Sequence, residues 1–215
     1  MSSRDRILGR LRGRAANPLS SQDATRSPGV APAEELLETF TERMTAVKGE
    51  VVTGQWSELP RLLGDWLEAA GVRSLVCGLD ERLEGLLQAL PGPVEILRFE
   101  RPFEELSRRL IGSVDAGLSH CDGAIAATGS LVFDSAPGRP RTVSLVPPLH
   151  VALLPLSRLY PDLDALLMEW SAQGGTQPTN RVLVSGPSKS ADIEQVLAYG
   201  VHGPKRLLTL VCLDA

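Results

Sequence analysis

A regular alternation of helical and strand-like segments, starting at Ala33, constrains the fold of this chain more than any other feature of its sequence. Apolar residues such as Leu36, Leu37 and Phe40 recur with helical spacing, and short continuous apolar runs separate the helical segments. The expected helices span 33–47, 57–70, 80–90 and 103–111, and the expected strands span 51–52, 74–77 and 94–99. Strands that alternate with helices of about ten residues need crossover connections, which predict a mainly parallel sheet covered on both faces.

The pattern changes in the second half of the chain. Strand-like runs over 124–127, 131–133 and 142–146 are separated by turn residues rather than by helices. Further strands are expected over 151–154, 181–184 and 207–213, with helices over 161–171 and 191–199. We therefore predict an α/β fold, with a mainly parallel sheet flanked by helices and with inserted β-hairpins.

Residues 1–32 differ in composition from the rest of the chain. The segment 4–14 places Ile7, Leu8 and Leu11 on one helical face among five arginines, and residues 15–32 form a polar, proline-containing stretch typical of a linker. We predict an arginine-rich N-terminal helix and linker over 1–32, followed by a single α/β domain over 33–215. The helix either docks on a partner subunit or anionic surface, or packs on its own domain, or is a frayed terminus.

Charge and cysteine content exclude several classes of protein. The formal net charge is −4, and neither half of the chain is basic enough to make nucleic acid the main partner. Cys77, Cys121 and Cys212 form no CxxC pair, so we expect no cofactor, iron–sulfur cluster or metal held by this chain alone. No run approaches the roughly 18 apolar residues of a membrane span, and the N-terminus lacks the apolar region of a secretory signal. We expect a cytoplasmic protein.

The strongest local signal for a binding site is the loop Gly186-Pro187-Ser188-Lys189-Ser190. It follows an expected strand and precedes an expected helix, which is where α/β sheets bind ligands and where helix N–H groups favour anions. Lys189 adds positive charge, and the two serines add hydroxyls. The spacing is not that of a phosphate loop, so we exclude nucleotide hydrolysis. In the alternative interpretation, Ser190 caps the helix and Asp192 complements its dipole.

Three other segments carry candidate ligand-binding groups. His202 lies between glycines in a second tight loop, and Thr128-Gly129-Ser130 offers hydroxyls and backbone N–H groups in a turn. Arg141 either clamps a carboxylate or pairs with Asp134 across a hairpin. His120 adjoins Cys121, a neighbourhood that we interpret as incidental. The predicted ligand-binding set is Thr128, Gly129, Ser130, Arg141, His150, Gly186, Pro187, Ser188, Lys189, Ser190, Asp192, His202 and Gly203.

Taken in order, these segments resemble the LUD-domain family, in particular its lactate utilisation protein C branch. The resemblance covers 114–215 and rests on the stretches CDGAIAATGSLVF, RPRTVSLVPPLHVALLP and VLVSGPSKSADIEQVLAYGVHGPKRLLTLV. It implies a fold related to the sugar-phosphate isomerase and CoA-transferase-like group, and a role in oxidising L-lactate to pyruvate beside separate iron–sulfur partner proteins. The family commonly has an acidic residue before its Thr-Gly, where this chain has Ala127, which puts acid–base chemistry at this position in doubt.

Two main functions follow from these observations. The first is a component of an L-lactate oxidation system that binds a small carboxylate metabolite, iron–sulfur partner subunits, or both. The alternative is a stand-alone isomerase- or acyl-transferase-like enzyme acting on a phosphorylated or CoA-linked metabolite, for which Asp192 is the best available base. A third, purely structural or regulatory role would act through the arginine-rich segment. The sequence assigns no catalytic residue.

Overall fold

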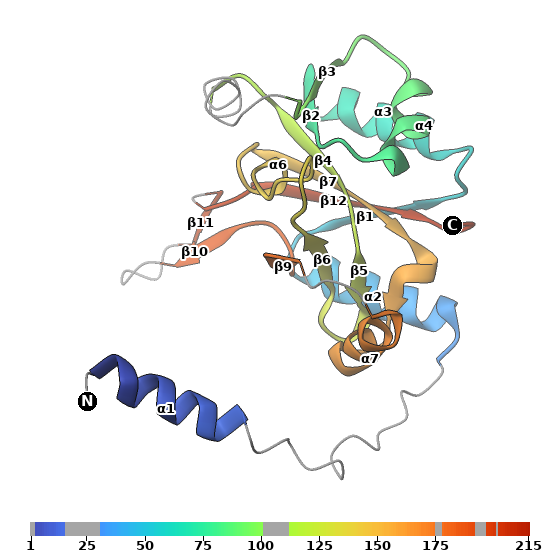
Figure 1. The fold of residues 1–215 in the computed structure, drawn as a ribbon. Helices are drawn as coiled ribbons and strands as arrows, with labels where there is room; N and C mark the ends of the chain where they lie inside the picture. The colour runs from blue at the N-terminus through green and yellow to red at the C-terminus, as the bar shows by residue number, and fades with distance from the viewer. Residues whose placement is uncertain (1–2, 16–30, 101–111, 175–177, 192–196, 201) are drawn as a thin grey trace.

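The computed structural model describes residues 3–15, 31–100, 112–174, 178–191, 197–200 and 202–215. Its centre is a six-stranded sheet in which every neighbouring pair of strands is parallel. In spatial order the strands are β1 (Glu50–Gly54), β12 (Arg206–Cys212), β7 (Leu149–Pro155), β4 (Ala116–His120), β2 (Ser74–Cys77) and β3 (Glu95–Arg98) (Figure 1). The mainly parallel α/β sheet predicted from the sequence is confirmed.

Helices α3 (Leu59–Ala69) and α4 (Glu81–Gln88) cover one face of this sheet. Side chains alternate between the faces of a strand, so Val151 and Leu153 of β7 pack toward these helices. Ala152 and Leu154 of the same strand pack toward the opposite face. Because both faces are buried, β7 and β12 are largely apolar, which explains why they were recognisable as strands in the sequence.

The opposite face is covered by α2 (Ala33–Ala46) and by a smaller sheet. Phe40 and Met44 of α2 are fully buried against the sheet. The smaller sheet has the order β8 (Leu159–Tyr160), β5 (Gly123–Ile125), β6 (Ser130–Asp134) and β9 (Arg181–Val184), and α7 (Leu163–Gln173) packs beside it. The 3-10 turn η1 (Ala126–Thr128) joins β5 to β6 within this sheet, and η2 (Leu156–Arg158) joins β7 of the central sheet to β8. The antiparallel pair β5–β6 is an inserted hairpin of the kind predicted.

The strand predicted over 142–146 is wrong, because this segment forms the short helix α6 (Thr142–Leu145). Thr142 and Val143 are β-branched and favour a strand, but packing overrides that preference. Val143 is buried with Val76 and Leu97, and its carbonyl lies so close to Gly117 that any side chain there would collide with it. One helical turn lets the segment lie directly on β4.

The helix predicted over 191–199 is also wrong at both of its ends. Lys189–Ala191 forms β10 and Leu197–Tyr199 forms β11, and the two strands pair antiparallel. The Gly200 N–H donates to the Ser188 carbonyl at 3.0 Å and continues this pairing. Residues 192–196 between the strands lie outside the described part of the chain, as does the helix predicted over 103–111.

The N-terminal helix is confirmed as α1 (Ser3–Ala15), whereas 16–30 of the predicted linker lie outside the described residues. Ile7 and Leu8 on α1 are exposed. A search of the described residues found no helix that is both long and apolar enough to span a membrane.

Candidate functional site

The order of strands reverses direction between β2 and β4. After β2 the chain adds β3 on one side of it, and then returns to place β4 on the other side (Figure 1). In open α/β sheets, ligands bind in the crevice at the carboxyl ends of the strands that flank such a reversal. Gly78 and Asp80 follow the end of β2, and Ser119 and His120 end β4. These residues therefore occupy the favoured position for a ligand.

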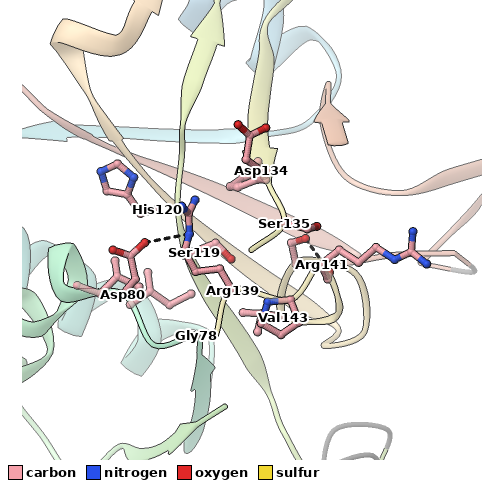
Figure 2. Close-up of a pocket in the computed structure, with 14 residues that line it drawn as sticks. Gly78, Asp80, Ser119, His120, Asp134, Ser135, Arg139, Arg141 and Val143 are labelled. Atoms are coloured by element: carbon pink, nitrogen blue, oxygen red, sulfur yellow. Dashed lines mark hydrogen bonds and ion pairs between the residues drawn. The ribbon is translucent and has the colours of Figure 1, made fainter. Parts of the chain in front are cut away.

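A small cavity opens at this position (Figure 2). The segment between β6 and β7 covers it, because the Leu79 N–H donates to the Gly138 carbonyl at 2.7 Å. A Cβ atom on Gly78 would lie 2.5 Å from that same carbonyl oxygen, so only glycine allows the covering turn to approach so closely. The lining residues are Gly78, Asp80, Leu83, Leu118, Ser119, His120, Phe133, Asp134, Ser135, Arg139, Pro140, Arg141, Val143 and Ser144.

Four charged side chains form a network beside the cavity. Arg82 binds the Asp80 carboxylate through two hydrogen bonds of 2.8 and 2.7 Å, and Arg139 contacts both Asp80 at 3.2 Å and Asp122 at 2.5 Å. Burial alone would raise the pKa of Asp80, but hydrogen bonds and charge from Arg82 outweigh it, so the pKa is lowered. Asp80 is therefore an ionised structural partner rather than a free proton acceptor.

His120 lines the cavity as a neutral imidazole. Its side chain is 8% exposed, and burial together with the charge of Arg82 lowers its pKa to about 4. The buried Nδ1 atom has no hydrogen-bond partner within the described structure. At neutral pH, His120 can donate or accept a hydrogen bond at a ligand, but it brings no positive charge.

His150, a predicted site residue, lies beneath the cavity instead of lining it. Its ring is fully buried, and burial lowers its pKa to about 3. Nε2 lies 3.1 Å from the Oγ atom of Ser119, and the ring packs edge-on against Phe133 with centroids 5.3 Å apart. Ser119 and Phe133 both line the cavity, so His150 reaches it only through these two neighbours.

Arg141, another predicted site residue, lines the cavity and is exposed. Asp134, its possible partner, is bound instead by Arg181 through hydrogen bonds of 2.6 and 2.8 Å. Among the described residues Arg141 has no ion-pair partner, so its charge is available to a ligand. Figure 2 shows its side chain extending away from Asp80 and His120, so contact with a ligand deep in the cavity requires a change of rotamer.

Thr128, Gly129 and Ser130 come together with the start of the predicted glycine loop, but not at the cavity. The hydroxyl of Ser130 lies 2.7 Å from the Thr128 hydroxyl and 2.7 Å from that of Ser185. Gly129 has a φ of 60° and packs against the backbone of α2, and Gly186, with a φ of 117°, packs against Val47. Close packing against α2 accounts for Gly129, and close packing against Val47, which follows α2, accounts for Gly186. A ligand role for Thr128, Gly129 and Ser130 stays a prediction.

The remaining described loop residues, including Ser188, His202 and Gly203, meet at the other end of the central strands. Ser188 donates its N–H to the Pro204 carbonyl at 2.8 Å and contacts the His202 N–H and Gly203. Pro204 and Lys205 precede β12, and the Lys205 N–H donates to Pro148 just before β7. This loop pair therefore lies at the amino ends of β7 and β12, whereas the cavity lies at the carboxyl ends of β2 and β4.

The structure thus divides the predicted composite site. Arg141 and His150 belong to the cavity region, and the other described members lie near α2 or at the amino edge. Pro187 is buried and Lys189 is exposed, while the side chain of Ser190 and all of Asp192 lie outside what the structure describes. The helix N-terminus expected at Ser190 is replaced by β10, so an anion site built on a helix dipole is not present in the described segment.

Sequence reasoning missed Asp80, Arg82, Asp122 and Arg139, and it set His120 aside as incidental. Recognising β4 would have revealed part of this set, because Asp80 and Asp122 each come shortly after a strand of the central sheet. Residues with this placement gather at the carboxyl edge of a parallel sheet. The alternation of helical and apolar segments that located β2 did not predict β4, so the position of Asp122 after a strand could not be recognised.

Comparison with known proteins gives a consistent result. The LUD domain profile matches residues 37–212. An uncharacterized protein of Neisseria meningitidis serogroup B is 34% identical over 99% of this chain and 94% of its own. Lactate utilization protein C of Exiguobacterium sp. is 33% identical, covering 86% of this chain and 80% of its own. Lactate utilization protein C of Halalkalibacterium halodurans is 30% identical, covering 84% and 80%.

One solved structure is also similar. The crystal structure of a DUF162 family protein from Deinococcus radiodurans superimposes with a TM-score of 0.65 and 22% sequence identity, covering 85% of this chain and 99% of that chain. At that level of identity the similarity shows a shared fold.

Proposed function

This chain belongs to the LUD-domain family, and on that basis we propose that it is a component of an L-lactate oxidation system, in which lactate becomes pyruvate. Relatives at 33% and 30% identity carry the name lactate utilization protein C, which supports this role. We propose that the chain binds a small carboxylate metabolite in the cavity at the carboxyl ends of β2 and β4.

The observation that carries the ligand proposal is the set of groups around the cavity. The two lining carboxylates, Asp80 and Asp134, are already paired with arginines, so neither repels an anion strongly. Arg141 has no ion-pair partner in the described structure, and Ser119 and neutral His120 add hydrogen-bonding groups. Arginine side chains bind carboxylates with directional, charge-assisted hydrogen bonds. A small hydroxy- or keto-acid matches this combination.

The same ion pairs count against the alternative of a stand-alone isomerase. Such an enzyme needs a general base with a pKa near the working pH. The pKa of Asp80 is lowered, and Asp134 is held by both oxygens to Arg181. Asp192, the base suggested by the sequence, lies outside the described residues.

We propose that iron–sulfur clusters in this system belong to partner subunits, since the cysteines of this chain do not suit a cluster. Such clusters are held by cysteine thiolates, usually four. This chain has three cysteines, all buried, in β2, after β4 and in β12. Among the described residues no group of three His, Cys, Asp or Glu side chains is placed to hold a metal ion.

We propose α1 as the contact with those partners. Ile7 is 60% exposed and Leu8 is also exposed, which supports docking through this face over packing on the same chain. Deleting residues 1–32 should abolish association with partner subunits in a pull-down assay and leave the melting temperature of the remaining domain unchanged. Retained association would exclude α1 as the contact.

Thermal denaturation with millimolar L-lactate or pyruvate tests the ligand proposal. Ligand that binds only the folded chain raises its melting temperature. We expect a rise for the unaltered chain and its loss in Arg141→Gln. Arg61→Gln serves as the matched control, because Arg61 is an exposed arginine on α3 that does not line the cavity. If neither L-lactate nor pyruvate raises the melting temperature, the proposal is contradicted.

A further inference from the structure

The pair formed by Ser119 and His150 has a chemical consequence for the cavity. Ser119 lies at the end of β4 and lines the cavity, whereas His150 lies on the neighbouring strand β7 and is fully buried. Their side chains meet at 3.1 Å between Oγ and Nε2. Whether the serine or the histidine supplies the shared proton decides what Ser119 can offer to a ligand.

The surroundings of His150 favour a proton on Nε2. A neutral imidazole carries its proton on one nitrogen only. Nδ1 is buried and has no partner in the described structure, so a proton there would leave an orphaned N–H group in the core. Buried N–H groups without an acceptor are rarer than unsatisfied acceptors. The proton therefore belongs on Nε2, and His150 donates it to Ser119.

The hydroxyl of Ser119 is then free to donate elsewhere. Its oxygen already accepts from His150, and its own proton is not used in that contact. We propose that His150 acts as a positioning residue that holds Ser119 as a hydrogen-bond donor, aimed at an acceptor oxygen of a carboxylate or keto-acid ligand in the cavity. This inference rests on the ligand site proposed above and deepens it by naming the group that recognises the ligand.

A nucleophilic role for Ser119 is a poorer fit to the same geometry. A serine nucleophile needs a histidine that accepts its proton, usually oriented by a third group on the other ring nitrogen. Among the described residues, Nδ1 of His150 has no such partner, and the imidazole packs edge-on against the ring of Phe133. The pair is arranged for binding rather than for covalent attack.

The tautomer of His150 can be measured directly in the full chain. Long-range proton–nitrogen NMR correlations of the imidazole distinguish a proton on Nε2 from one on Nδ1, and assignment uses the His150→Gln variant. We expect the Nε2–H form at neutral pH. The Nδ1–H form would overturn the proposal, because Ser119 would then donate its proton to His150.

Calorimetric titration with pyruvate tests the donor role. We expect Ser119→Ala to weaken binding about tenfold, the usual scale for one lost hydrogen bond to a charged or polar ligand group. His150→Leu should weaken binding by a similar factor, with no further loss when combined with Ser119→Ala. His150→Gln keeps an N–H donor in reach of Ser119 and should restore part of the affinity.

The outcomes separate this inference from the function on which it rests. Failure of the unaltered chain to bind either pyruvate or L-lactate would contradict the proposed ligand, and the tautomer measurement would then decide the donor claim by itself. Binding that is unchanged in Ser119→Ala would overturn the donor role and leave the ligand proposal standing. A parallel titration with propionate, which lacks the keto oxygen, shows which oxygen is recognised. Equal losses indicate the carboxylate, and a loss with pyruvate alone indicates the keto oxygen.

Discussion

The Arg139 guanidinium binds the Asp122 carboxylate at 2.5 Å, although the whole β5–β6 hairpin separates the two residues in sequence. Arg139 also contacts Asp80 in the loop after β2. The Arg139 side chain therefore links the turn that covers the cavity to the residues that follow β2 and β4. Removing it should loosen the cover and destabilise the domain.

We predict that Arg139→Met lowers the free energy of unfolding by about 2 kcal/mol. Removing one partner of a fully buried ion pair lowers stability by more than this, and the partial exposure of Arg139 and Asp122 reduces the loss. Arg61→Met is the matched control, because Arg61 pairs with Asp65 on the surface of α3, with side-chain exposures of 65% and 63%. Such exposed pairs contribute about 0.5 kcal/mol or less. Urea denaturation measures both variants, and equal losses would contradict this account of Arg139.

Gly78 should be intolerant of substitution. Its Cβ would lie 2.5 Å from the Gly138 carbonyl oxygen, which is backbone and can move only with the covering turn. We predict that Gly78→Ala costs about 1–3 kcal/mol of stability, as overpacking does, and weakens ligand binding. Gly112→Ala is the control, because nothing lies within 4 Å of its Cβ position. Denaturation and pyruvate titration of both variants check the prediction.

Stability should fall as the pH drops from about 6.5 toward 4. In the unfolded chain, His120 and His150 titrate near 6.5, whereas in the folded chain burial lowers their pKa values to about 4 and about 3. Between these values the unfolded chain binds more protons, so stability rises with pH. Each histidine contributes a slope of up to about 1.4 kcal/mol per pH unit.

Urea denaturation at several pH values measures this slope. His150→Gln should reduce it, and His202→Gln, which alters an exposed histidine, should leave it unchanged. A slope that is the same in all three proteins would show that His150 is not buried in its neutral form.

The three thiols should be unreactive in the folded chain. Burial raises the pKa of Cys77 and that of Cys212 to about 11, and it also raises that of Cys121. The thiolate is the reactive form, so a thiol reagent at pH 8 should label none of them until the chain is unfolded, when all three react. Rapid labelling of a folded thiol would point to a redox or metal-binding role that the core position of these residues does not suggest.

Much of the fold could be predicted from the sequence, because most strands of the central sheet are buried on both faces and read as apolar runs. The strands expected over 74–77 and 181–184 match β2 and β9 at both ends. β4 escaped notice because Gly117, Ser119 and His120 interrupt its apolar pattern. Two of these residues, Ser119 and His120, line the cavity.

The site was harder to predict, because it depends on strand order. Asp80, His120 and Arg139 are far apart in sequence and meet only because β4 returns to the free side of β2. Glycine-rich loops gave a stronger local signal, but Gly129 is explained by close packing against α2, and Gly186 by close packing against Val47 just after α2. The prediction of a helix after Ser190 was wrong because the spacing of apolar residues in so short a run does not distinguish a helix from a hairpin.

Amide chemical-shift mapping with pyruvate tests the central claim most directly, because one titration distinguishes binding at the carboxyl ends of the central strands from binding at their amino ends. The claim is that the ligand binds at the carboxyl ends of β2 and β4. We predict saturable shifts confined to 78–80, 119–120 and 135–144, with little change at Ser188, His202 and Gly203. Shifts centred on those three loop residues, or no saturable shifts, would contradict it.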